Sequence, residues 1–105
     1  MARLSDYEIS KILEQNPEWE VVDEDGISKL VQRFAFRNFI EALEFSNKVG
    51  ALAEDSDHHP KLVVEWGSLE VWWWSHDEGG MVPADAEMAA EVDHLFAELK
   101  NELAR

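Results

Sequence analysis

Imidazole side chains are the groups in this sequence best suited to acid–base chemistry. The chain has only four histidines among 105 residues, and two of them, His58 and His59, are adjacent in the stretch DHHP at residues 57–60. An imidazole has an unperturbed pKa near 6.5, so it can donate or accept a proton close to neutral pH. The sequence has no cysteine, which excludes thiolate nucleophiles, thiolate metal ligands and disulfides. The histidine pair therefore points to proton transfer.

A third histidine, His76, follows a run of tryptophans in the stretch WWWSHDEGG. The segments KLVVEW and LEVWWWS are typical of two β-strands joined by a turn at Gly67 and Ser68. Residues that enter the first strand of a hairpin and residues that leave the second lie at the same end of the sheet. We therefore expect His76 to lie near His58 and His59. Acidic and hydroxyl side chains are expected beside them, with aromatic side chains on their flank: Glu54, Asp57, Ser75, Asp77 and Asp85, then Trp66, Trp72 and Trp74.

Two other interpretations of the histidines stay open at this point. A histidine pair before Pro60 can cap the preceding helix and hydrogen-bond to loop carbonyl groups, with no chemical role. Three imidazoles can also hold a zinc ion and leave one position open. Adjacent histidines rarely reach one metal, however, and no H-x-H or H-x-x-x-H spacing occurs, so we expect no metal site. The fourth histidine, His94, lies among acidic residues of a predicted helix and is expected to be solvated.

Three helices are predicted to support the strands. The first lies in LSDYEISKILEQNP, where Ser5 and Glu8 form a capping-box pattern and Pro17 follows the end. The second begins at Asn38, which can cap it, and the third has Pro83 in its first turn. The last two carry apolar residues at helical spacing: Phe39, Ala42, Leu43, Phe45, Val49 and Leu52, then Ala89, Val92, Phe96, Leu99 and Leu103.

A first hairpin is predicted between the first two helices. The segments WEVV and ISKLVQRFAF flank an acidic turn, DEDG at residues 23–26, in which Gly26 can supply a positive φ. Leu30, Phe34 and Phe36 share one face of the second strand at period two. This strand is therefore expected to be half buried.

The resulting order is helix, two strands, helix, two strands, helix, in one domain that spans residues 1–105. The expected fold is α+β, with a four-stranded antiparallel sheet and the three helices packed on one face. Trp72 and Trp74 are expected on the opposite face, where an uncovered apolar surface would favour a homo-oligomer, either a dimer or a tetramer.

The charge of the chain disfavours two classes of partner. Nine basic residues are scattered among 23 acidic ones, for a formal net charge of −14, whereas nucleic-acid phosphates and anionic membranes require clustered Lys and Arg. Apolar runs are too short to cross a bilayer, and the first residues lack a secretory signal pattern. We expect a cytoplasmic protein that binds neither nucleic acid directly nor a membrane.

The sequence resembles the pterin-4a-carbinolamine dehydratase family over nearly its whole length. The resemblance is carried by Glu54, the DHHP stretch, Trp66, the pair Ser75 and His76, the glycines at 79–80, and Asp85. The stretches EWG and WWSH are similar to the bacterial branch associated with phenylalanine hydroxylase, and Trp19 and FAFRNF match the first hairpin and the following helix start. One departure is Val82, where the family often has a Ser or Thr that caps the last helix.

The resemblance implies a hydro-lyase that converts a 4a-hydroxytetrahydropterin to a quinonoid dihydropterin. This reaction regenerates the cofactor of aromatic amino acid hydroxylases, and such a hydroxylase is a possible partner. By resemblance, His58 and His76 supply the acid and the base, in an order that the sequence does not assign, and His59 chiefly binds the pterin. The pterin is the substrate, so no other cofactor and no metal are expected. The remaining substrate-binding candidates are Glu54, Asp57, Pro60, Trp66, Ser75 and Asp85.

A binding role is the alternative. Members with this fold resemble partners of an animal homeodomain transcription factor and assembly factors of a carbon-fixing enzyme. Such members can lose the histidines, so the presence of His58, His59 and His76 favours the enzyme.

Overall fold

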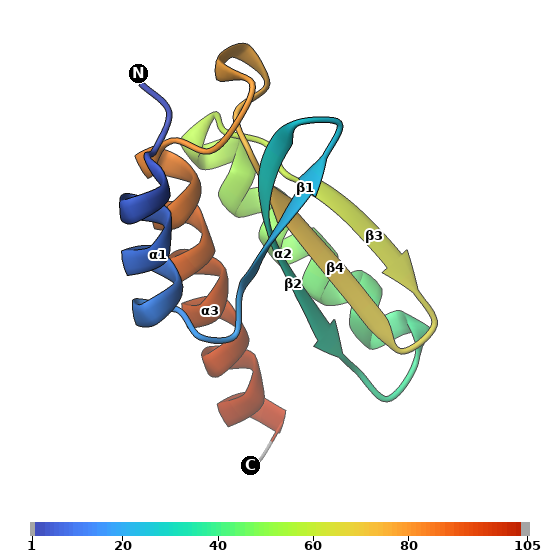
Figure 1. Cartoon of the computed structure of the whole chain (residues 1–105). Coiled ribbons are helices and arrows are strands. Elements are labelled where there is room, and N and C mark those ends of the chain that lie inside the picture. The colour runs from blue at the N-terminus through green and yellow to red at the C-terminus, as the bar shows by residue number, and fades with distance from the viewer. Residues whose placement is uncertain (1, 104–105) are drawn as a thin grey trace.

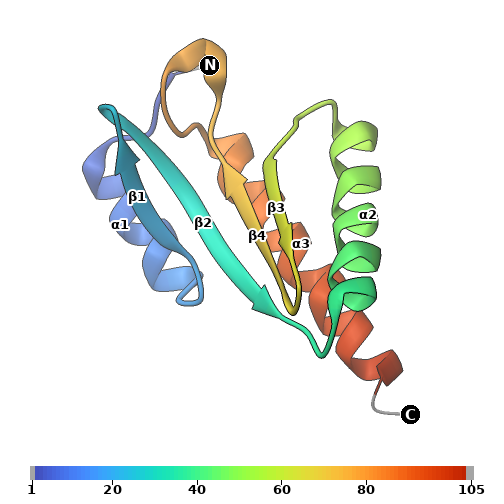
Figure 2. The same cartoon turned by 90° about the vertical axis from the view of Figure 1, so that its right-hand side faces the viewer.

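The structure, a computed structural model that describes residues 2–103, has the predicted order of elements and the predicted α+β fold. Figures 1 and 2 show a twisted sheet with the helices against one of its faces. No helix among these residues is long and apolar enough to span a membrane. The elements are α1 (Asp6–Gln15), β1 (Glu20–Glu24), β2 (Ile27–Ala35), α2 (Phe39–Ser56), β3 (Lys61–Glu65), β4 (Ser68–Trp73), the short 3₁₀-helix η1 (His76–Glu78) and α3 (Pro83–Leu103).

The sheet is antiparallel throughout, in the order β1-β2-β4-β3. Its register pairs Leu30 of β2 with Trp73 of β4, and Val31 with Trp72. Because side chains alternate between the faces of a strand, Trp73 points toward the helices and Trp72 toward the open face. β4 pairs with β2 on one side and with β3 on the other, so it lies in the interior of the sheet and not at an edge.

The core fills the space between the sheet and the helices. Trp73, Phe45, Leu30, Leu69 and Val71 are fully buried there. Each such side chain contributes about 1.5–3 kcal/mol relative to an exposed position. A rigid core of this kind fixes the end of β4, on which the site described below depends.

Both predicted helix caps are present. Ser5 and Glu8 form a complete capping box at the start of α1, and the Asn38 side chain accepts a hydrogen bond from the Glu41 N–H at the start of α2. Each cap satisfies backbone N–H groups that have no partner inside the helix.

The two hairpin turns differ from the prediction by one or two residues. In the first hairpin the strand continues through Glu24, and the turn is only Asp25 and Gly26, both with positive φ (53° and 79°). In the second hairpin Trp66 and Gly67 form the turn and Ser68 already belongs to β4. Two-residue turns suit the twist of paired strands better than longer acidic loops, and Gly67 has a φ of 80° that favours glycine.

Two of the apolar positions expected to cover the sheet are exposed instead. Phe39 is 46% exposed and Leu103 is 53% exposed. Phe39 opens α2 and Leu103 ends α3, which runs beyond the sheet in Figure 2. Helical spacing alone predicts the buried side of a helix, but not where the sheet beneath it stops.

The tryptophans near the open face are half buried by lysine side chains of the same chain. Lys61 Nζ lies 4.7 Å from the ring centre of Trp72, and Lys29 Nζ lies 4.1 Å from that of Trp74. The open face is therefore less apolar than the sequence predicts, because the lysine stems cover the indole rings. Large apolar side chains are exposed at other places: Tyr7, Phe39, Ile40, Trp66 and Leu103.

We expect the chain to form at least a dimer, because these exposed apolar side chains lose contact with water in an interface. Light scattering at micromolar concentration should give a mass of at least twice 12.1 kDa. A single species of 12.1 kDa would contradict this expectation.

Candidate active site

His58, His59 and His76 line one pocket of about 450 Å³. The pocket lies between the end of α2, the end of β4, η1 and the start of α3. The loop after α2 and the loop after β4 lie at the same end of the sheet in Figure 2. The remaining lining residues are Asp57, Pro60, Trp74, Ser75, Asp77, Glu78, Val82 and Ala84.

A sharp reversal after α2 places the histidine pair. Asp57 has a left-handed conformation with φ 50°, and its N–H donates to the carbonyls of Ala53 and Glu54. The His58 N–H also donates to the Ala53 carbonyl, at 3.1 Å. These bonds satisfy carbonyls at the helix end, and the chain then enters β3 through Pro60.

The His58 ring is held by a bond at its edge and by a stacking contact on one face. Its Nε2 atom lies 2.5 Å from Asp85 Oδ1, and its ring stacks on Trp73 with 5.5 Å between ring centres and 9° between planes. Asp85 is fully buried and also accepts hydrogen bonds from the Ser75 hydroxyl (3.1 Å) and the Val82 N–H (2.8 Å). An ionised carboxylate can only accept, so we assign the proton of His58 to Nε2. Its Nδ1 atom then remains available for chemistry.

At the start of α3 the N–H that a capping side chain at position 82 would satisfy, that of Asp85, donates to the Val82 carbonyl at 2.9 Å instead. Val82 cannot cap α3 with its own side chain, but the carboxylate three residues later accepts from its N–H. The departure at Val82 therefore leaves this N–H satisfied, and it leaves Asp85 in place beside His58.

His59 lies at the rim of the pocket. Its Nε2 atom contacts Glu54 Oε2, and both side chains are largely exposed. An exposed pair of this kind adds little stability, but it restrains the direction of the imidazole.

His76 opens η1, which closes at Gly79 with a φ of 66°. A bridge between Ser75 and Gly80 joins the two ends of this loop. Within residues 2–103 the His76 ring has no hydrogen bond or ion pair, and it packs against Trp74 with 4.6 Å between ring centres. Both ring nitrogens are therefore free to meet a ligand.

Trp66 does not lie beside the histidines, contrary to the expectation from sequence. It is 73% exposed and belongs to the turn between β3 and β4. In Figure 2 this turn is at the end of the hairpin opposite to the loop that follows α2. The five residues of β3 separate Trp66 from Pro60, and six steps of 3.3 Å along a strand amount to roughly 20 Å. Trp72 is also absent from the pocket lining, so Trp74 is the one expected flanking tryptophan that reaches it.

Trp73 is a residue of the site that the sequence argument did not assign. It lies in the core, and its ring forms the surface on which His58 stacks. The alternation of side chains along the WWW run could have indicated this position, because Trp73 points to the face of the sheet opposite to that of Trp72 and Trp74. His94 lies elsewhere on α3, 72% exposed and 3.7 Å from Glu91.

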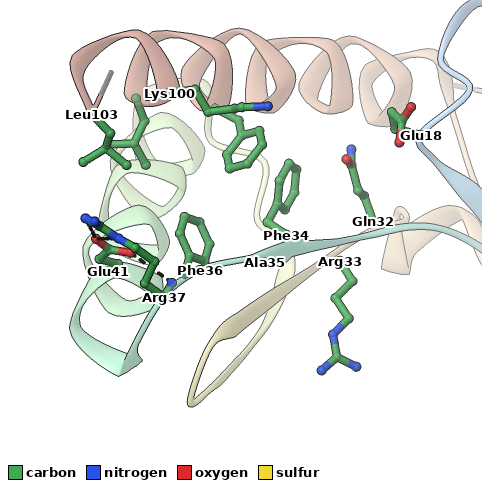
Figure 3. A pocket seen from close by; sticks show the side chains of 12 residues that line it. Glu18, Gln32, Arg33, Phe34, Ala35, Phe36, Arg37, Glu41, Lys100 and Leu103 are labelled. Carbon is green, nitrogen blue, oxygen red and sulfur yellow. Dashed lines mark hydrogen bonds and ion pairs between the residues drawn. The ribbon is translucent and has the colours of Figure 1, made fainter. Parts of the chain in front are cut away.

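A larger cleft of about 730 Å³ lies between the second half of α3 and β2 (Figure 3). Phe34, Phe36 and Phe96 line it, and none of its lining residues is a histidine. At one end Arg37 hydrogen-bonds Glu41, which lowers the pKa of that carboxyl. The acid–base groups therefore gather in the smaller pocket. No group of three or more His, Asp or Glu side chains in the described part of the chain is arranged to hold a metal ion.

A family model described as pterin 4 alpha carbinolamine dehydratase matches residues 2–95. The chain belongs to this family. A relative from Chlorobium luteolum is 50% identical over 91% of this chain and 84% of its own length. It is provisionally named a pterin-4-alpha-carbinolamine dehydratase. A relative from Saccharophagus degradans with the same provisional name is 48% identical over 85% of this chain and 79% of its own.

Two solved structures of pterin dehydratase-like proteins share the fold. The crystal structure of a transcriptional coactivator/pterin dehydratase from Brucella melitensis has a TM-score of 0.79 and 28% identity, over 88% of this chain and 96% of that one. A pterin dehydratase-like protein identified as a RuBisCO assembly factor in the alpha-carboxysome has a TM-score of 0.61 and 24% identity, over 74% of this chain and 88% of that one. The second likeness concerns the fold alone.

Proposed function

We propose that this chain dehydrates a 4a-hydroxytetrahydropterin to a quinonoid dihydropterin in the cytoplasm, and so recycles the cofactor of an aromatic amino acid hydroxylase. The observation that carries the proposal is the set of three imidazoles around one pocket, with His58 bonded to the buried Asp85. The pocket volume of about 450 Å³ lies within the usual range for small-molecule sites, roughly 300–1,000 Å³.

The bonding of the imidazoles supports a division of labour. His58 donates from Nε2 to Asp85, so its free Nδ1 acts as the base that accepts the ring-nitrogen proton. His76 acts as the acid and protonates the departing hydroxyl. The C–O bond breaks, a C=N bond forms and water leaves. An Asp–His pair in this arrangement stabilises the imidazolium that forms on the base.

The other predicted residues are assigned to binding. His59, restrained by Glu54, binds the pterin at the rim, where Asp57 and Pro60 also line the pocket. Ser75 lines the pocket while its hydroxyl donates to Asp85. Trp66 of the same chain is at the far end of the hairpin, so a role for it in binding requires a second subunit.

A binding protein is the second candidate. The relative from Brucella melitensis is named both a transcriptional coactivator and a pterin dehydratase, and Phe39, Ile40 and Leu103 are exposed here. These side chains lie on α2 and α3 and are absent from the lining of the histidine pocket, so a binding role and the dehydratase activity are compatible.

A stopped-flow assay with synthetic 4a-carbinolamine tests the proposal. The protein should accelerate quinonoid dihydropterin formation by roughly 10² to 10⁴ over the spontaneous rate, the usual contribution of positioned acids and bases. Prolonged chelation should leave this rate unchanged, because proton transfer between imidazoles and substrate needs no metal. A rate equal to the spontaneous one would refute the activity, and a chelator-sensitive rate restored by zinc would refute the acid–base mechanism.

A further inference from the structure

Lys29 is a largely buried lysine of β2 whose ammonium has two partners. Its side chain is only 13% exposed, and Nζ lies 2.9 Å from Glu24 Oε1 and 4.1 Å from the ring centre of Trp74. Removing an ammonium from water costs free energy unless other groups replace the water. A carboxylate and an aromatic face do so here, and the hydrogen bond from Lys29 lowers the pKa of Glu24. The ammonium is therefore fixed in place.

Trp74 connects this lysine to the histidine pocket. The sheet pairs Leu30 with Trp73, the last residue of β4, so Trp74, which follows it, comes beside Lys29. The Trp74 ring lines the pocket, and its centre lies 4.6 Å from that of the His76 ring, with 40° between the planes. One indole thus touches both the fixed ammonium and an imidazole of the site.

The orientation of the His76 ring depends on its contact with Trp74, whereas the other two histidines of the pocket have bonded partners. His58 has both Asp85 and Trp73, and His59 has Glu54. The His76 ring has no hydrogen bond or ion pair within residues 2–103, and its side chain extends from a three-residue 3₁₀-helix. Its direction is therefore set mainly by the tryptophan beside it.

We propose that Lys29 is a positioning residue for His76 and acts through Trp74: the ammonium fixes the indole, and the indole fixes the imidazole. This role rests on the proposed function in so far as His76 is the acid of the reaction. The link between the three side chains is a property of the fold and can be tested without substrate.

The chain offers a matched control in a second lysine–tryptophan pair. Lys61 Nζ lies 4.7 Å from the ring centre of Trp72, and the Trp72 Nε1–H donates to Glu70 at 3.0 Å. No histidine packs on the Trp72 ring among the described residues. Removal of either ammonium disrupts a similar contact, but only Lys29 is linked to His76.

The test compares Lys29→Met with Lys61→Met, since methionine keeps an apolar stem and removes the charge. In NMR spectra, the His76 ring-proton resonances should move toward those of a solvent-exposed histidine in Lys29→Met and stay unchanged in Lys61→Met. In the dehydratase assay, Lys29→Met should lower kcat roughly 10-fold with a smaller change in KM, because small misplacements of a catalytic group are costly. Lys29→Arg, which keeps a cation over the indole, should recover part of the kcat that Lys29→Met loses.

Equal His76 spectra in Lys29→Met and Lys61→Met would overturn the positioning role, as would equal kcat values in an active enzyme. If the original protein lacks dehydratase activity but the His76 resonances move only in Lys29→Met, the proposed function is wrong and the link from Lys29 to His76 stands. Melting temperatures of the variants measure any general loss of stability separately.

Discussion

His58→Ala and His76→Ala are each expected to lower kcat by about 10² to 10⁴, with a smaller change in KM. Proton transfer matters more in the transition state than in the bound ground state, so loss of the acid or the base acts mainly on kcat. Single-turnover rates with synthetic carbinolamine measure the effect after the spontaneous rate is subtracted.

Two other histidines serve as controls for this prediction. His59→Ala should raise KM more than it lowers kcat, because His59 lies at the pocket rim with Glu54. His94→Ala should change neither parameter, because His94 is exposed on α3, away from the pocket. The double variant of His58 and His76 should lose less than the product of the single effects, since one elimination uses both groups. If the double variant keeps full activity, the site is in the wrong place.

Asp85→Asn is expected to lower kcat by about 10² to 10⁴ and the free energy of unfolding by about 1–3 kcal/mol. Asp85 accepts from Ser75 and Val82 and lies 2.5 Å from His58 Nε2.

The physical reason is the different bonding capacity of an asparagine, which has one acceptor oxygen and one donor nitrogen. If its oxygen faces Ser75 and Val82, its NH₂ faces His58 Nε2, and the imidazole proton must move to Nδ1. The base then presents no free lone pair to the substrate. Histidine ¹⁵N shifts should report this change of tautomer, and urea unfolding should report the stability.

Asp93→Asn is the matched control on the same helix. Asp93 accepts from Trp19 Nε1 and Gln32 Nε2, both at 2.9 Å, and has no contact with a pocket histidine. It should lose stability with an unchanged kcat. An Asp85→Asn protein that folds and retains the original kcat would show that Asp85 has no part in the chemistry.

Local sequence patterns determined most of the fold. The capping box of Ser5 and Glu8, the cap at Asn38 and the alternation that buries Leu30 and Phe34 act over a few residues, so their outcome follows from neighbours in the chain. The convergence of His58, His59 and His76 followed from hairpin geometry. The position of each turn did not follow, because the twist of the paired strands selects two-residue turns at Asp25–Gly26 and Trp66–Gly67.

Contacts between distant segments decided the details of the site. The sequence predicts Asp85 near the histidines, but not that its carboxylate bonds to His58, 27 residues away, or that Trp73 supports the His58 ring. Trp66 lies apart from the histidines of its own chain because the turn between β3 and β4 is at the end of the hairpin opposite to Pro60. The covering of Trp72 and Trp74 by Lys61 and Lys29 likewise depends on strand register. Residue types and spacing determine which acid–base groups are present. Proton transfer also depends on distances of a few ångströms between these groups, and packing of the sheet against the helices sets those distances.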